Sequence, residues 1–196
     1  MLSMTDLPTR LREQSAELEP QLMVAADLPA RVSNRRDYAA LLCQLLAFYT
    51  PIENQLDDSQ WMLDWGKVNL LVKDYRRVAL LQNDLASLGG VALVPVLPLP
   101  TMANFGQLLG CLFALEFASP GGRMLSPGIR AAIGNVPTSF YDHEQRDHQR
   151  DVLRLDAALR SYEEGGGDRE QVLLGACITA AAFRTYLGQS VWAARR

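Results

Sequence analysis

The stretch DYAALLCQLLAFYTPIENQL, Asp37 to Leu56, carries the strongest structural pattern in the sequence. Its large apolar residues recur three and four positions apart, which is the spacing of one broad face of a helix. That face comprises Tyr38, Leu41, Leu42, Leu45, Leu46, Phe48, Tyr49 and Ile52. We expect Pro51 to bend the helix, because its nitrogen cannot donate to the carbonyl one turn back. The stretch therefore predicts a long helix with one side packed into a core.

Helical patterns of the same kind cover most of the remaining sequence. A first helix is expected to begin near Asp6, an N-cap candidate followed by Pro8. Its narrow apolar stripe comprises Leu7, Leu11, Leu18 and Leu22. Further helices are predicted over residues 68–88, 101–119, a short stretch from 126, 138–164 and 168–190. Strand-like alternation and internal repeats are absent from the sequence, which predicts an all-α multi-helix bundle in one domain over residues 1–196.

Glycine and proline mark the breaks between these helices. Gly89 and Gly90 are expected to stop the helix predicted over 68–88. The proline-rich residues 91–100, VALVPVLPLP, predict an extended connector, because residues before proline are pushed out of the helical region. EEGGGD, residues 163–168, predicts a turn whose last residue caps the final helix.

Composition limits the classes of protein to which the chain belongs. Its 196 residues, 48% of them hydrophobic, suffice for one sizeable core, and a net charge of -3 without a basic stripe argues against nucleic acid as a partner. Three prolines interrupt the most apolar stretch, which argues against a membrane span. Cys43, Cys111 and Cys177 lie far apart in apolar runs and are expected to be buried thiols of a reducing compartment. We therefore expect a soluble cytoplasmic protein.

Metal-ligating residues are sparse. The two histidines, His143 and His148, are five positions apart, or about 140° around a helix, so they cannot share one metal, whereas Glu144 and His148 can. The surrounding polar segment is equally typical of a solvated helix face. Five acids on separate predicted helices leave a di-iron carboxylate oxidase open as an alternative, although no Glu-x-x-His pair occurs. They are Glu19, Glu53, Asp84, Glu116 and Glu144.

The run LGCLFALEFASPGGRML, Leu109 to Leu125, combines a buried helix with a glycine pair. Pro120 must kink or stop the helix, and Gly121 and Gly122 lack Cβ atoms. Their backbone can therefore lie close to a neighbouring helix or to a flat ligand. A plain helix end explains the same residues, and both interpretations stay open.

Four segments, in order along nearly the whole chain, resemble the heme oxygenases, in particular the bacterial biliverdin-producing branch. LREQSAELEPQL, residues 11–22, resembles the family's opening LRxxTxxxHxxL, and residues 37–56 resemble its second helix. RRVALLQNDLASLGG, residues 76–90, is similar to the family's R..L..DL..LG stretch, and FALEFASPGGRML, residues 113–125, to its distal YVLEGSTLGG helix. The matched residues are Leu11, Arg12, Ser15, Leu22, Tyr38, Leu41, Leu42, Tyr49, Glu53, Arg77, Leu81, Asp84, Leu85, Leu88, Gly89, Glu116, Gly121 and Gly122.

The resemblance implies a fold that holds heme, as the substrate, between a proximal helix near the N-terminus and a kinked distal helix. It also implies an electron donor as partner and cleavage of heme by O₂ to biliverdin, CO and iron. Glu19 stands at the position of the iron-binding histidine, and Gly121 and Gly122 at the distal glycines. Further heme contacts are implied for Phe117 and Ala118 on the distal helix and, at the propionates, for Arg12, Arg150 and Arg154.

Two departures from the family pattern concern the heme site itself. Glu19 supplies a hard anionic ligand that favours ferric iron over the reduced iron that O₂ activation needs, and Pro20 is expected to disturb its projection from the helix. Phe117 replaces the family's first distal glycine, and its ring is expected to fill part of the heme space. A second hypothesis is therefore a non-catalytic relative that binds another flat hydrophobic ligand or a protein partner.

Overall fold

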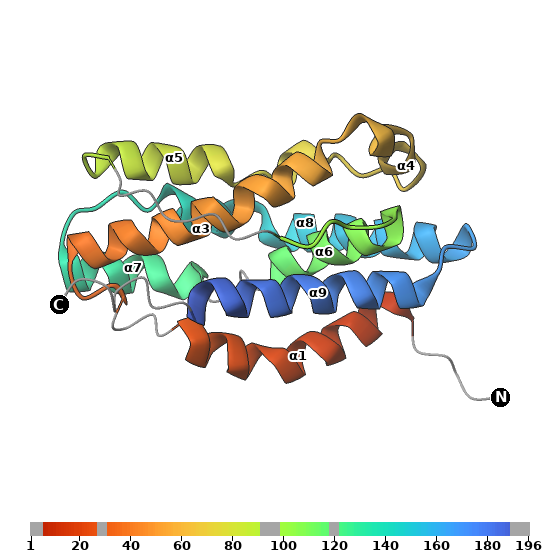
Figure 1. The fold of residues 1–196 in the computed structure, drawn as a ribbon, viewed down its shortest axis with the longest axis horizontal. Coiled ribbons are helices and arrows are strands. Elements are labelled where there is room, and N and C mark those ends of the chain that lie inside the picture. The colour runs from red at the N-terminus through yellow and green to blue at the C-terminus, as the bar shows by residue number, and fades with distance from the viewer. Residues whose placement is uncertain (1–5, 27–30, 91–98, 118–121, 189–196) are drawn as a thin grey trace.

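The computed structural model describes the backbone of residues 6–26, 31–90, 99–117 and 122–188, and their side chains except those of 17–26, 122–125 and 143–148. Within these ranges all regular structure is helical, which confirms the predicted all-α class (Figure 1). The elements are α1 (Leu7–Ala26), α3 (Arg35–Leu56), η1 (Ser59–Trp61), α4 (Met62–Lys67), η2 (Val72–Tyr75), α5 (Val78–Ser87), α6 (Phe105–Phe117), α7 (Gly122–Ile133), α8 (Ser139–Glu164) and α9 (Arg169–Gly188).

Helices α6 and α9 pack closely at the centre of the molecule. A Cβ atom added to Gly110 of α6 would lie 1.9 Å from the carbonyl oxygen of Val172, and one added to Gly175 of α9 would lie 2.0 Å from that of Gln107. The two backbones therefore touch where neither helix carries a side chain. Residues on nearly every side of α6 are buried, so this helix is the hydrophobic centre around which the others pack.

The other helices surround this pair. Helix α1 packs along α9 and also contacts α8, while α3 contacts α5 and α9. Helix α8 contacts α7, α5 and α6. Figure 1 shows α3 and α5 on one side of the molecule and α1 on the opposite side, with α9 beside α1. The broad apolar face predicted for α3 is buried almost throughout and forms part of the core.

Short polar side chains fix several helix ends where the sequence predicts them. Asp6 accepts a hydrogen bond from the backbone N–H of Thr9 at 3.1 Å, and Asp168 accepts one from Glu170 at 2.9 Å. Gly89 has a φ of +93°, the left-handed conformation that ends a helix at little cost for glycine. The predicted starts of α1 and α9 and the glycine stop after α5 are thereby confirmed.

The predicted helix over residues 68–88 is wrong in its first half. This segment contains the short helix η2 and then the separate helix α5, with Arg76 in an extended conformation between them. Glu53 of α3 causes the interruption, because its carboxylate accepts the backbone N–H groups of Arg77 and Val78 at 2.5 and 2.7 Å. A side chain 24 residues earlier in sequence thus begins α5, which a local pattern does not reveal.

Two further boundaries differ from the predictions. Helix α6 begins at Phe105, not near 101, because the Asn104 side chain accepts the N–H of Gln107 at 3.0 Å. Helix α7 begins at Gly122 and continues through Pro127, so the predicted start at 126 is four residues late. Helix α1 continues past Pro20 to Ala26, in agreement with its predicted apolar stripe to Leu22, while the expected effect of Pro20 on the Glu19 side chain lies outside the described residues. Residues 91–98 of the predicted connector lie outside the described residues.

Candidate ligand-binding site

The structure describes half of the sequence-predicted site residues by their side chains. Glu19 lies on the helical backbone of α1 and Gly122 begins α7, but the Glu19 side chain lies outside the described residues. Ala118 and Gly121 lie outside them as well. The geometry of the candidate site therefore rests on Arg12, Phe117, Arg150 and Arg154.

Arg12 and Phe117 meet, although 104 residues separate them in the sequence. The Arg12 guanidinium carbon lies 5.8 Å from the centre of the Phe117 ring, which is the geometry of a cation–π contact. The Phe117 ring stacks on Phe113, with centroids 4.2 Å apart and planes 21° apart. The contact joins α1 to the C-terminal end of α6. These are the two segments that the resemblance places on either side of heme.

Arg12 also forms an ion pair with Asp156 on α8, through its Nη2 atom and Oδ2 of the carboxylate. The Asp156 side chain is only 9% exposed, whereas the Arg12 side chain is 34% exposed. Within the described part of the chain, Oδ1 of Asp156 is buried and has no hydrogen-bond partner. Asp156 is therefore a buried carboxylate with one oxygen paired and the other unpaired, which is a costly arrangement.

Sequence reasoning missed Asp156. The available signal was its place between Leu155 and Ala158, both fully buried apolar residues of α8. An acid beside such positions lies at the edge of the packed helix face and needs a cation from a neighbouring helix. The sequence does not say which cation, because Arg12 is 144 residues away.

Arg150 and Arg154 do not join Arg12. Arg154 Nη1 lies 3.2 Å from Oδ2 of Asp74, and Arg150 Nε lies 3.4 Å from Oδ1 of Asp151. Arg154 and Asp156 are two residues apart on α8, about 200° around the helix, so they face different sides. The three arginines that the resemblance assigns to the propionates therefore do not form one cluster.

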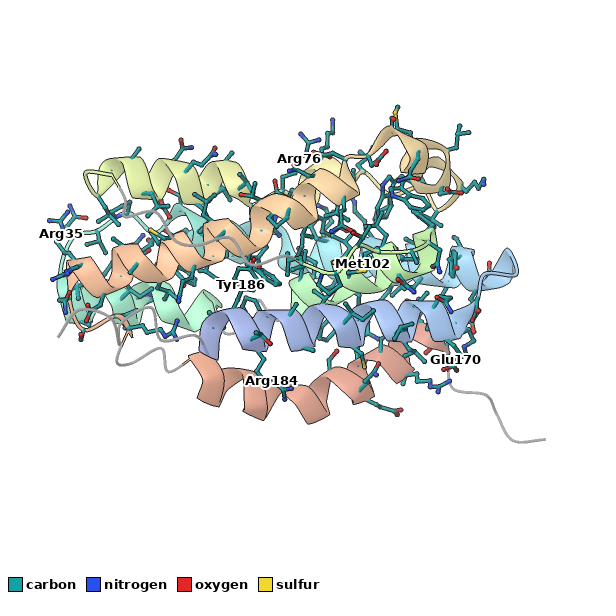
Figure 2. The ribbon with its side chains drawn as sticks, viewed as in Figure 1. Arg35, Arg76, Met102, Glu170, Arg184 and Tyr186 are labelled. Atoms are coloured by element: carbon teal, nitrogen blue, oxygen red, sulfur yellow. The ribbon has the colours of Figure 1, made fainter. Side chains whose placement is uncertain are left out.

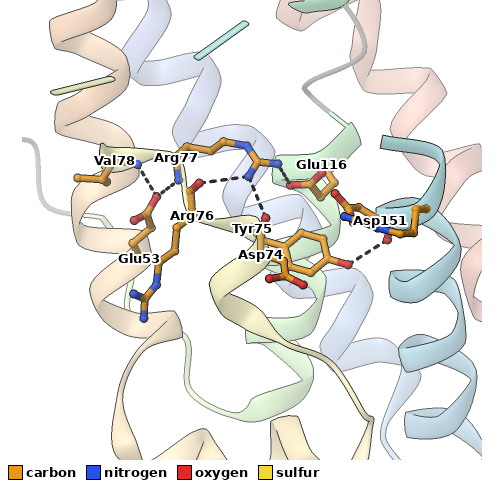
Figure 3. A network of polar contacts seen from close by, with 9 residues as sticks. Glu53, Asp74, Tyr75, Arg76, Arg77, Val78, Glu116 and Asp151 are labelled. Carbon is orange, nitrogen blue, oxygen red and sulfur yellow. Dashed lines mark hydrogen bonds and ion pairs between the residues drawn. The ribbon is translucent and has the colours of Figure 1, made fainter. Parts of the chain in front are cut away.

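A second polar cluster is buried near the end of α6 (Figure 3). Arg77 Nη2 lies 2.9 Å from Oε1 of Glu116, and each side chain is 4% exposed. Arg77 also donates through Nη1 to the carbonyl oxygens of Asp74 and Arg76 at 3.3 and 3.2 Å. Together with the Glu53 carboxylate at the start of α5, these bonds tie α3, η2, α5 and α6 together.

Burial raises the pKa of Glu116, against the opposing effect of Arg77 and with a further contribution from the negative charge of Asp151. The Tyr75 hydroxyl donates to the backbone carbonyl of Asp151 at 2.9 Å, and burial raises the pKa of that phenol. These bonds extend the cluster to α8. Its residues hold helices together inside the molecule, which is a structural role.

Asp84 has a comparable role, since its two carboxylate oxygens each accept a backbone N–H at 3.0 Å, from Ser139 and Phe140 at the start of α8. Glu53, Asp84 and Glu116 are thus used as helix caps or in an ion pair. Among the residues whose side chains are described, no group of three or more His, Cys, Asp or Glu is placed to hold a metal ion.

The thiols divide into two kinds. Cys43 and Cys111 are buried, as predicted, and burial raises their pKa values to about 11 and about 12. Cys177 is only partly buried and accepts a hydrogen bond from Gln14 Nε2 at 2.7 Å. The two buried thiols are therefore protonated at neutral pH and unreactive.

In the described part of the chain, no helix has the length and apolar character needed to cross a bilayer.

The chain matches no known family model, no curated protein sequence and no solved structure.

Proposed function

We propose that this protein binds heme between α1 and the C-terminal end of α6, and that it is a heme-oxygenase-like protein in which cleavage of heme is slow or lost. The observation that carries the proposal is the contact of Arg12 with Phe117. It brings the helix that bears Glu19 next to the end of the helix that leads to Gly121 and Gly122. The resemblance implies a heme site between these two segments.

The residues at this place fit part of what heme requires. A partly exposed guanidinium suits a ligand with a carboxylate edge, because it offers a charged fork to that edge, while the Phe117 ring beneath it is already stacked on Phe113. A carboxylate at position 19 in place of an imidazole favours ferric over ferrous heme. The proposal is therefore binding of ferric heme, with little of the reduction that oxygenation by O₂ needs.

The residues that carry the resemblance support a retained scaffold. Glu53, Arg77, Asp84 and Glu116 all match the family pattern, and each one caps a helix or forms the buried ion pair. Residues of the heme site, by contrast, depart from the pattern at Glu19 and Phe117. The proposal requires this combination, in which the helical scaffold is retained and the residues at the heme site are changed.

A second candidate function is binding of a different flat hydrophobic ligand, or of a protein partner, without heme. The packing of Phe117 favours this second function, because the ring is stacked on Phe113 and covered by Arg12 of α1. A side chain in that place reduces the room for a macrocycle. The di-iron alternative receives no such support, because three of its five acids serve the helix ends and the buried ion pair.

The proposal is tested by titrating the purified protein with hemin and following the Soret band. We expect saturation at about one heme per chain and, after a reductant is added in air, little or no biliverdin absorption. Glu19→His should sharpen the Soret band and raise the yield of biliverdin, because a neutral imidazole supports ferrous iron. Glu13→His is the matched control, since Glu13 is exposed on the same helix.

Two results would decide against this proposal. Absence of saturable hemin binding in a folded protein would exclude heme and favour the second candidate. Identical spectra for the Glu19→His, Glu13→His and unaltered proteins, with hemin bound, would mean that position 19 does not face the iron.

A further inference from the structure

We propose that residues 57–76, which we call the corner segment, form an apolar surface through which two copies of this chain pair about a two-fold axis. The segment contains η1, α4 and η2 and lies at one corner of the molecule (Figure 1). Its Trp65 packs on Phe105, the first residue of α6, whereas the candidate ligand site lies at Phe117, the last. Phe105 and Phe117 are about 18 Å apart along the helix, so this proposal does not depend on the proposed function.

Three of the five exposed large apolar side chains among the described residues lie in the corner segment. Met62 is 69% exposed, Leu63 80% and Leu71 60%. The other two, Leu153 and Leu174, lie singly on α8 and α9. Single exposed apolar residues are common on protein surfaces, whereas a group of them marks an interaction surface.

The backbone beneath these side chains is firmly held. The indole N–H of Trp65 donates to the carbonyl oxygen of Leu56 at 3.1 Å, and its ring meets Phe105 edge-on with centroids 4.7 Å apart. The N–H of Leu70 donates to the carbonyl oxygen of Trp65 at 3.1 Å, which folds Leu71 back toward α4. A surface fixed in this way loses little conformational freedom when it binds a partner.

The charges of the corner segment and of the one α8 cation that it binds sum to zero. The four acids are Asp57, Asp58, Asp64 and Asp74, and the four cations are Lys67, Lys73, Arg76 and Arg154. Three ion pairs lie within this set, with nitrogen–oxygen distances of 2.5–3.2 Å, and Figure 2 shows one of their members, Arg76, at the surface. A surface without excess charge does not attract a polyanion or the headgroups of an anionic membrane, so the expected partner is neutral in sum at this contact.

Asp58 and Lys73 are the charges that remain without an ion pair among the described residues. The Asp58 carboxylate accepts the backbone and side-chain N–H groups of Gln60, each at 3.0 Å, and Lys73 is exposed. Along the chain, one unpaired charge of each sign thus stands on either side of the exposed apolar residues. Two-fold pairing brings each of two contacting positions against the other twice, so Asp58 of each copy can meet Lys73 of the second copy. This self-complementarity favours a second copy as the partner.

Sedimentation velocity of the purified protein between about 1 μM and about 1 mM tests the proposal, because small apolar interfaces associate in this range. We expect an equilibrium between monomer and dimer that is weakened about tenfold or more in Leu63→Gln and unchanged in Leu153→Gln. Leu153→Gln is the matched control, since Leu153 is 61% exposed but lies outside the corner segment. Circular dichroism checks that each variant is folded.

The variants Asp58→Lys and Lys73→Asp test the two-fold arrangement. Each alone places like charges opposite one another at both contacts of the dimer and should weaken dimerisation by about tenfold. An equimolar mixture of the two variants should restore the affinity, because every contact then joins opposite charges. This rescue also shows that both variants are folded.

A protein that stays monomeric up to about 1 mM overturns the proposal. If that monomer sediments with vesicles of phosphatidylcholine and phosphatidylglycerol, and Leu63→Gln does not, the corner segment binds a lipid surface instead. Equal weakening by Leu63→Gln and Leu153→Gln, or growth beyond a dimer, overturns the proposal as well. A mixture of the charge variants that associates no more tightly than either alone overturns the two-fold pairing of Asp58 with Lys73. None of these outcomes bears on the binding of hemin, which is measured separately.

Discussion

The ion pair of Arg77 with Glu116 is the most deeply buried pair of charges described in the chain, with 4% of each side chain exposed. Arg77 is further held by two backbone carbonyls, and its own N–H is bound to Glu53. Such a pair contributes little net stability compared with apolar residues of the same size, but removal of one partner strands a buried charge. Removing one of the two residues should therefore destabilise the fold more than replacing both with apolar residues.

Arg77→Met should lower the free energy of unfolding by about 3–5 kcal/mol at neutral pH, because Glu116 is left without its cation. The double variant Arg77→Met with Glu116→Leu should recover a large part of this loss. Arg10→Met, which breaks the exposed pair with Glu170, is the control and should cost no more than about 1 kcal/mol. Urea denaturation measures the free energy of unfolding of all three variants. Equal losses in Arg77→Met and in the double variant would contradict the interpretation.

At the scale of helices, apolar spacing predicts those elements that are stabilised by a continuous face. The prediction for residues 37–56 agrees with α3, and that for 138–164 agrees with α8 to within one residue. Elements begun by a distant side chain were not predictable, as the Glu53 cap on α5 shows. The same reason explains why Asp156 was missed, since its partner Arg12 comes from another helix and no local pattern joins the two.

The close packing of α6 on α9 makes a sharper prediction at this scale. Gly110→Ala places a methyl group 1.9 Å from the Val172 carbonyl oxygen and 2.9 Å from the Ala176 nitrogen, both backbone atoms that cannot rotate away. The helices must move apart along a fully buried contact, so we expect a loss of about 3 kcal/mol. Thermal denaturation, monitored by circular dichroism, measures this loss of stability.

Gly128→Ala is the matched control for this variant. Gly128 is an exposed residue of α7, and no atom lies within 4 Å of an added Cβ. Alanine should therefore leave stability unchanged or raise it by up to about 1 kcal/mol, because alanine favours a helix over glycine. Similar losses in the two variants would contradict this interpretation, because the loss would then not depend on the contact between α6 and α9.

For the whole molecule, the pattern of buried polar groups separates the scaffold from the candidate site. The carboxylates of Glu53, Asp84 and Glu116 bind backbone N–H groups or Arg77, and they fix how α3, α5, α6 and α8 pack. The sequence alone did not distinguish these acids from metal ligands, because both uses place an acid on the inner side of a helix. Only the positions of the partner groups, which the fold supplies, separate the two.

The same buried charges predict how the stability of the whole molecule depends on pH. Burial raises the pKa of Glu116 above its usual value of 4.5, so the folded state binds this proton more tightly than the unfolded state does. The resulting stabilisation is fully present below pH 4.5 and is lost as the pH rises through the raised pKa. Burial alone would raise the pKa of Asp142, but hydrogen bonds from Ser126 and Thr138 and the charge of Arg130 outweigh it and lower the pKa below 3.8. The resulting stabilisation is present above pH 3.8 and is lost as the pH falls through the lowered pKa.

These two contributions to stability fall off in opposite directions, that of Glu116 as the pH rises from 4.5 and that of Asp142 as it falls from 3.8, and Glu116→Gln separates them. We expect this variant to lose the decline on the alkaline side of pH 4.5 while it keeps the decline below pH 3.8, because glutamine does not titrate and Asp142 is unchanged. Urea denaturation at a series of pH values measures both slopes. If Glu116→Gln retains the full alkaline-side decline, the proton is bound elsewhere and Glu116 is ionised throughout, held by Arg77 as a permanent ion pair.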